Sequence, residues 1–191
     1  MIFPNWVDIV MVLFLARQIY KARESNLITE GLRLLGIILA TFFALHYYSP
    51  IGVFFKKNLI VFDKVFDLVA FSIIAWIIIL FFEGICKGWI AILKWNIYPV
   101  IDRNVGFFLG VIKSFLLGGI IFYSLCVSGI DSISDGVKNS VTRSLFGNLS
   151  VAVYQTVFLD IITPFFPEEK PNTKVFIFSD EDLSLTKTAA P

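Results

Sequence analysis

The chain has 191 residues, of which 57% are hydrophobic and only 16% are charged, and its formal net charge is +1. A water-soluble domain carries about 25% charged residues to cover its surface, so this composition excludes an ordinary soluble domain. Together with a mean hydropathy of +0.81, it predicts an integral membrane protein whose first partner is the lipid bilayer. The near-neutral charge gives no support for a nucleic-acid partner.

Four segments are apolar enough to be predicted as transmembrane helices, because a bilayer core of about 30 Å needs roughly 20 helical residues. They cover residues 2–20, 34–55, 104–128 and a third segment that begins near residue 65, for which a tilted or interfacial extension past Glu83 to residue 93 is left open. The first is interrupted by Asp8 and Arg17, whereas the second has no charge. None of them alternates as a barrel strand does. The predicted fold is therefore all-α, a polytopic membrane bundle with a four-helix transmembrane domain over residues 1–130.

Beyond residue 130 the pattern changes to mixed apolar and polar sequence. Apolar residues recur every four positions, at Val141, Leu145, Leu149, Val153 and Val157. This spacing predicts an amphipathic, interfacial helix within 131–166. A fifth span over 145–163 remains an alternative, because residues 145–158 carry no charge. Prolines then end the helix, and the polar tail 167–191 is predicted to be disordered.

Small residues gather at two places in the predicted spans. Gly106, Gly110, Ser114 and Gly118 follow one another four apart in the fourth span, and Gly84 and Gly88 form a second pair in the third. Because lipid offers no hydrophobic gain from helix association, close backbone packing at small residues has to supply it. We interpret both sets as helix-packing surfaces. For the four-membered stripe, packing within the monomer, a homo-oligomer seam and a pore lining are the three alternatives.

Two charged residues, Asp8 and Lys113, fall inside predicted spans, where an unpaired charge is costly. One hypothesis pairs them across the bundle as a polar centre or an ion or proton path. The other places Asp8 at the membrane interface beside Trp6, an aromatic residue typical of that level. Asp102 and Arg103 precede the fourth span, where we expect them to be interfacial, with Asp102 on a helix dipole and Arg103 among lipid phosphates.

The sequence contains no pattern of a catalytic or cofactor-binding motif such as GxSxG, HExxH, Walker A or GxGxxG. His46 is the single histidine, so a multi-histidine metal site is excluded. Cys86 and Cys126 lie in apolar runs and are expected to be buried free thiols. Glu83 and Asp67 flank the third span and are expected at the interfaces. We therefore expect neither an enzyme nor a cofactor.

The chain resembles the colicin V production protein family over roughly residues 5–128. The resemblance rests on the stretches NWVDIVMV, EGLRLLGIILATFFA and IDRNVGFFLGVIKSFLLG. The family pattern falls on Trp6 and Asp8, on Asp102, Arg103 and Gly106, and then on Gly110 and Lys113. The chain departs from it at Ser114, where the family tends to have glycine, but serine still permits close packing.

The resemblance implies a multi-pass protein of the bacterial inner membrane. It also implies an association with production or export of the toxin colicin V and with envelope homeostasis. Our interpretation is a structural or accessory role, and a second copy or other envelope proteins are the expected partners. The lysine and arginine residues of the short loops favour both termini in the periplasm. The alternative function is a small channel or transporter with a polar path near Asp8 and Lys113.

Overall fold

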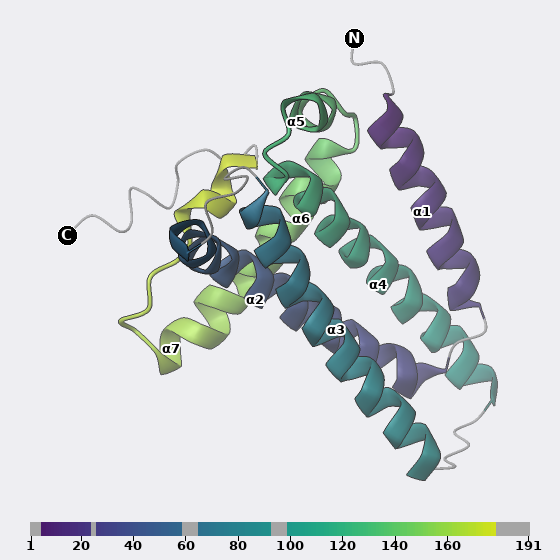
Figure 1. The fold of residues 1–191 in the computed structure, drawn as a ribbon. Helices are drawn as coiled ribbons and strands as arrows, with labels where there is room; N and C mark the ends of the chain where they lie inside the picture. Colours follow the sequence, from purple (N-terminus) through teal and green to yellow (C-terminus); the bar gives the residue numbers. More distant parts are fainter. Residues whose placement is uncertain (1–4, 24–25, 59–64, 93–98, 179–191) are drawn as a thin grey trace.

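The computed structural model describes residues 5–23, 26–58, 65–92 and 99–178, and within these ranges the regular structure is helical (Figure 1). The elements are α1 (Trp6–Ala22), α2 (Leu27–Asn58), α3 (Phe66–Ile92), α4 (Pro99–Val127), α5 (Asp131–Lys138), α6 (Arg143–Thr156), the π-helical η1 (Val157–Ile162), α7 (Thr163–Phe165) and the 3-10 helix η2 (Thr173–Phe178). The predicted all-α fold class is confirmed.

Four helices of the described chain are long and apolar enough to cross a membrane, judged by length and composition. They are Leu27–Lys57, Phe66–Trp89, Asp102–Val127 and Arg143–Phe165. The sequence also predicted four membrane-spanning helices, but they are not the same four segments. The helix of the first predicted span, α1, has 17 described residues, fewer than the roughly 20 that a crossing needs.

The fourth of these helices replaces most of the interfacial helix predicted for 131–166. It runs without a break through α6, η1 and α7 and has 23 residues. The sequence alone favoured an interfacial helix because Asn148 and Gln155 dilute its apolarity. The alternative of a membrane span beyond residue 130 therefore agrees better with the structure.

The helices α2, α3, α4 and α6 surround a core rich in aromatic side chains. Phe71 and Tyr123 lie 5.6 Å apart between ring centroids, and Phe42 lies 5.6 Å from Tyr154. In Figure 1, α4 lies between α1 and α3. The outer face of α3 is different, because it leaves large apolar side chains exposed: Ile73, Trp76, Ile77, Leu80 and Phe81. Lipid acyl chains would cover such a face, as expected for a helix at the edge of a membrane bundle.

Local sequence explains where several helices begin and end. At the start of α1 the Asn5 side chain accepts a hydrogen bond from the Val7 N–H at 2.7 Å, and the Asp8 carboxylate accepts one from the Asn5 N–H at 2.9 Å, which completes a capping box. After α4, Gly129 has a φ of 65°, a left-handed conformation that glycine adopts without strain.

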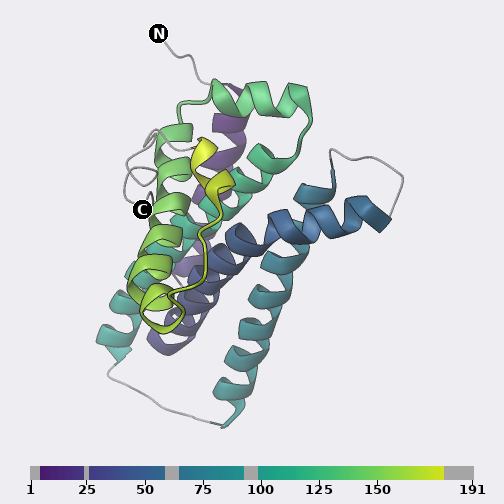
Figure 2. The same cartoon turned by 90° about the vertical axis from the view of Figure 1, so that its left-hand side faces the viewer.

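The first part of the predicted disordered tail is packed onto the bundle, which corrects that prediction for residues 173–178. Val175 is fully buried in the core, and Figure 2 shows the C-terminal segment running along α6. The Asn172 side chain donates to the Leu45 carbonyl at 2.7 Å, while its N–H donates to the Tyr154 hydroxyl at 2.8 Å. Both hydrogen bonds come from the single residue Asn172, and the polar composition of the tail does not predict that one of its residues fixes it to the bundle. Residues 179–191 lie outside the described part.

Candidate functional site

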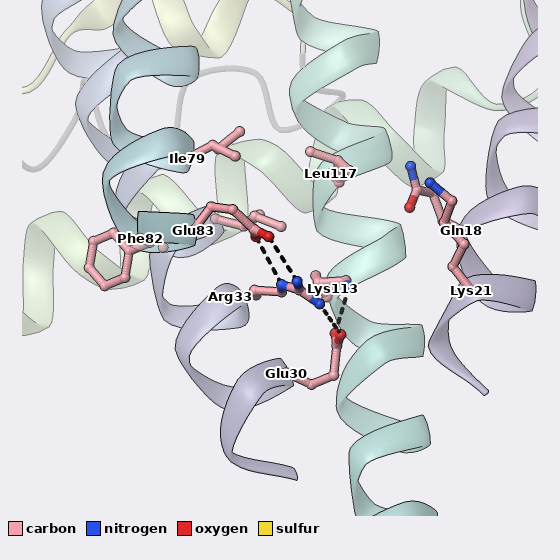
Figure 3. Close-up of a pocket in the computed structure, with 11 residues that line it drawn as sticks. Gln18, Lys21, Glu30, Arg33, Ile79, Phe82, Glu83, Lys113 and Leu117 are labelled. Carbon is pink, nitrogen blue, oxygen red and sulfur yellow. Dashed lines mark hydrogen bonds and ion pairs between the residues drawn. The ribbon is translucent and has the colours of Figure 1, made fainter. Parts of the chain in front are cut away.

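Four charged side chains form a network that joins α2, α3 and α4 (Figure 3). The Lys113 ammonium lies 2.5 Å from Glu30 Oε2, and Arg33 Nη1 lies 3.1 Å from Glu30 Oε1. Arg33 also binds Glu83 through two bonds of 2.9 Å, from Nε to Oε2 and from Nη2 to Oε1. Every oxygen of the two carboxylates therefore faces a cation.

The position of the network explains why all four charges are retained in an apolar chain. The Glu30 side chain is 0% exposed and that of Lys113 is 12% exposed. A buried charge costs several kcal/mol when it is left alone, so each group requires its partners. Glu30 and Arg33 stand three residues apart on one face of α2, so that Arg33 reaches both Glu30 and the neighbouring α3.

A cavity of about 290 Å³ borders this network. Gln18 and Lys21 of α1 line one side, and Ile79 and Phe82 of α3 line the other, as Figure 3 shows. Leu117 of α4 adds to the apolar wall. The cavity therefore combines a charged floor with an apolar wall, which suits a small ligand that has both characters.

The small residues of the α4 stripe are all buried, and the stripe contacts two different helices. A β-carbon added at Gly110 would lie 2.5 Å from the Ala22 β-carbon of α1, and one at Gly118 would lie 2.7 Å from Phe146 Cε1 of α6. The hydroxyl of Ser114 donates to the Gly110 carbonyl at 2.6 Å, so it needs no partner on another helix. The stripe thus allows α1 and α6 to approach α4 closely.

The second small pair behaves differently. Gly84 and Gly88 are exposed, and a β-carbon added at either would meet no atom within 4 Å. The interpretation as a packing surface therefore does not hold for them within the described chain. Gly36 was missed instead, although its added β-carbon would lie only 2.6 Å from Phe82 Cβ. Gly36 thus permits the close approach of α2 and α3 beside the cavity.

Asp8 joins the N-termini of two helices and does not pair with Lys113. In addition to its bond within the α1 capping box, its carboxylate accepts hydrogen bonds from the N–H and the hydroxyl of Thr142, both at 2.9 Å, and from the Val141 N–H at 3.3 Å. These donors stand at the start of α6, where the helix dipole favours an anion. The hypothesis of an Asp8–Lys113 polar centre is therefore wrong, since Lys113 binds Glu30.

The protonation of Asp8 reflects these contacts. Burial alone would raise the pKa of this carboxyl, but the hydrogen bonds from Asn5, Thr142 and Val141 outweigh burial and lower the pKa below its ordinary value of 3.8. Trp6, expected beside it at the interface, is half exposed and packs near Gly136 of α5.

Asp102 plays a similar part at the opposite end of the bundle. Its Oδ1 accepts a hydrogen bond of 2.9 Å from the N–H of Leu27, the first residue of α2. The neighbouring Arg103 is exposed and, with Arg23, lines a shallow surface pocket of about 210 Å³. In the Asp-Arg motif, Asp102 therefore caps the N-terminus of α2, and Arg103 remains at the surface.

Sequence reasoning did not find Glu30 and Arg33 and placed Glu83 at an interface. The second span was predicted to begin at residue 34, at the first charge-free position, so both α2 charges fell outside it. The available signal was the acid–base pair three residues apart, which is typical of a salt bridge on a helix. Among the described residues, no three His, Cys, Asp or Glu side chains come together in a way that could hold a metal.

This fold, with its long apolar helices and its buried ion pairs between them, defines a multi-pass helical membrane protein. A model of the family described as colicin V production protein matches residues 7–151. Because the match covers most of the chain, the chain belongs to the colicin V production protein family. The matched region is longer than the resemblance predicted from the sequence and reaches into α6. Asp8 and its partner Thr142 therefore both lie within the matched region. No curated protein and no solved structure matches the chain.

Proposed function

We propose that the chain is a structural or accessory component of the bacterial inner membrane, without enzymatic activity, that acts in production or export of a colicin V toxin and in envelope homeostasis. The family description supports the link to the toxin. The packed centre of the bundle supports a structural role, and it is the observation on which this proposal depends.

That centre is filled with side chains between the charged network and the α5 end of the bundle. Leu45, Phe71 and Tyr123 are at most 1% exposed and belong to one continuous apolar cluster. A permeation path needs polar groups or water through the whole bilayer core of about 30 Å. A closed core favours a scaffold, which holds other components, over a conduit.

Complementation in a toxin-producing host tests the accessory role. A strain that lacks the gene is given the wild-type chain, Gly110→Leu or Gly84→Leu, and secreted toxin is measured by growth inhibition and immunoblotting of the medium. We expect Gly110→Leu to fail, because its side chain would collide with Ala22, and Gly84→Leu to restore secretion, because it points into open space. Normal secretion without the gene would contradict the proposal.

A small channel or transporter is the second candidate, and the charged cavity beside Lys113 is the observation that favours it. Asp8 has no part in such a path. Ion and solute flux through purified protein in liposomes separates the two candidates. The accessory role predicts no flux above that of empty liposomes. Flux that the double variant Lys113→Met with Glu30→Gln removes, in protein shown to be folded, and that Lys57→Met leaves intact would establish the conduit.

We further propose that both termini lie on the periplasmic side and that a second copy or another envelope protein is the partner. Two contacts support a common side for the termini. The Asn5 side chain donates to the Gly136 carbonyl at 2.6 Å, and the Tyr123 hydroxyl donates to the Val175 carbonyl at 3.4 Å. Both contacts lie at the α5 end of the bundle. Alkaline phosphatase fused at either end should be active if the assignment is right.

A further inference from the structure

We propose that the C-terminal segment 166–178 is a strap that locks a hinge in α2 at Pro50, so that release of the segment lets the outer part of α2 change its angle. This device goes beyond the accessory role and does not depend on it. Three features support it: a carbonyl that Pro50 leaves without its helical donor, an amide of the segment that reaches the same turn, and the small number of contacts that hold the segment.

The hinge follows from a proline inside a membrane-spanning helix. Pro50 lies within α2, which continues to Asn58. Because proline has no N–H, the carbonyl of His46, four residues earlier, lacks its helical hydrogen bond, and a proline at such a position kinks the helix. Figure 2 shows α2, drawn in dark blue, changing direction along its length. Residues 51–58 therefore form an outer part that is joined to the rest of α2 by a weakened turn.

This outer part of α2 is attached to the start of α3. Lys56 Nζ lies 3.0 Å from Asp67 Oδ2, and a β-carbon added at Gly52 would collide with the same carboxylate. A change of angle at Pro50 would therefore carry the first turn of α3 with it.

The side chain of Asn172 supplies a donor at the weakened turn. Its Nδ2 lies 2.7 Å from the Leu45 carbonyl oxygen and 3.5 Å from that of His46. Inside a bilayer, a carbonyl freed by proline has no bulk water to bind and needs a partner within the protein. Asn172 meets this need from outside the helix, so the segment stabilises the turn that Pro50 weakens.

A chain of hydrogen bonds connects the same turn to the segment a second time. The two ring nitrogens of His46 each lie 3.0 Å from a partner, Nδ1 from the Tyr154 hydroxyl and Nε2 from Glu169 Oε1. The Tyr154 hydroxyl also accepts a hydrogen bond of 2.8 Å from the Asn172 N–H. The segment therefore holds the last turn before Pro50 through Glu169 as well as through Asn172.

Few other contacts hold the segment, which allows it to leave while the bundle stays folded. Among its described side chains only Val175 is buried, whereas residues 166–171, 173 and 174 are exposed. A region with few buried apolar contacts opens at a lower free energy than the core. Coupling between two equilibria is reciprocal, so whatever removes the segment also shifts the hinge.

Distance measurement by double electron–electron resonance tests the proposal on the purified full-length chain in lipid nanodiscs. One spin label is attached at Lys57→Cys in the outer part of α2 and the other at Ser132→Cys in α5, which packs on α4 and not on the outer part of α2. Both positions are exposed. The buried Cys86 and Cys126 are replaced by alanine in every sample.

The expected change follows from the length of the outer part. Residue 57 lies seven residues beyond Pro50, which is about 10 Å of helix. A change of about 20° at the kink therefore moves it by roughly 4 Å. We expect Asn172→Ala to broaden the distance distribution by about this amount, and the matched control Thr173→Ala, at an exposed neighbour, to keep the wild-type width.

Two further variants separate the lock from a general loss of order. Pro50→Ala restores the N–H of the turn, so adding Asn172→Ala to that variant should leave the distribution narrow. Glu169→Ala removes the other anchor at an exposed side chain and should also broaden the distribution, which provides the test if Asn172→Ala does not fold. A wild-type width in folded Asn172→Ala, or in Glu169→Ala in its place, would overturn the lock. Broadening that persists in the Pro50→Ala chain would overturn the hinge.

Discussion

Replacing Lys113 with methionine should destabilise the bundle because it leaves a carboxylate without its closest cation. Glu30 is 0% exposed and would lose the ammonium at 2.5 Å, while it keeps Arg33 at 3.1 Å. Removing one member of a buried ion pair costs about 3–5 kcal/mol. Because Arg33 continues to bind Glu30, we expect a loss near the lower end, about 3 kcal/mol of unfolding free energy.

A second substitution distinguishes this electrostatic cause from lost packing. In the double variant Lys113→Met with Glu30→Gln, the buried charge is gone, and the glutamine can still accept a hydrogen bond from Arg33. The double variant should therefore lose only about 1 kcal/mol, the value of an ordinary hydrogen bond, and should be more stable than Lys113→Met alone. Reversible unfolding in mixed detergent micelles measures all three free energies.

The reasoning would be refuted by either of two results. If Lys113→Met unfolds at the wild-type free energy, the ion pair does not carry the stability assigned to it. If the double variant is no more stable than the single one, the loss comes from the lysine stem or from another neighbour. In that case Glu30 is not the group that requires Lys113.

Three further predictions concern the packing stripe, the helix caps and the C-terminal segment. Gly110→Leu should lower the unfolding free energy by about 2–3 kcal/mol through overpacking, whereas Gly84→Leu should leave it unchanged. Asp8→Asn should cost about 1 kcal/mol at pH 7, the usual value of a cap. Because the pKa of Asp8 is lowered in the folded chain, its contribution is complete above 3.8 and is lost as the pH falls through the folded value, so the two proteins should converge in acid. Asn172→Ala should release the C-terminal segment and accelerate tryptic cleavage at Lys174, measured by mass spectrometry.

Each of these predictions has an outcome that contradicts it. A Gly110→Leu variant as stable as Gly84→Leu would mean that α1 does not pack closely on α4. A stability difference between wild type and Asp8→Asn that stays constant below pH 4 would show that the carboxylate is not stabilised in its charged form. For the tail, the matched control is the exposed Thr173→Ala, and equal cleavage in both variants would mean that Asn172 is not the anchor.

The helical class and the α4 stripe could be predicted from the sequence because both depend on local, periodic patterns. Long apolar runs specify helices in lipid whatever their partners are. Four small residues spaced four apart must share a helix face, so the sequence predicts a close helix contact at Gly110 and Gly118 whatever the neighbouring helix is. Which helix packs there depends on the tertiary arrangement, and sequence could not name Ala22 or Phe146.

The charged network could not be predicted for a physical reason. Sequence rules treat a charge as the end of a membrane span, because an isolated charge is costly in lipid. Glu30, Arg33 and Glu83 escape that cost by pairing across helices, and such pairing is invisible without the fold. The same reasoning explains the error at Asp8, whose partner at Thr142 lies far along the chain on a helix that had been placed at the interface.

Sided cysteine labelling tests the central claim, a bundle whose helices cross the membrane with the charged network between them. Lys57 lies at the C-terminal end of α2. Arg103 of α4 lies near the other end of α2, because its neighbour Asp102 accepts a hydrogen bond from the N–H of Leu27, the first residue of α2. The 32 residues of α2 correspond to about 48 Å of helix, more than the bilayer core of about 30 Å. In sealed vesicles, an impermeant maleimide should label Lys57→Cys from one side and Arg103→Cys from the other, against the buried Cys86 and Cys126 as background. Labelling of both positions from the same side would contradict the claim.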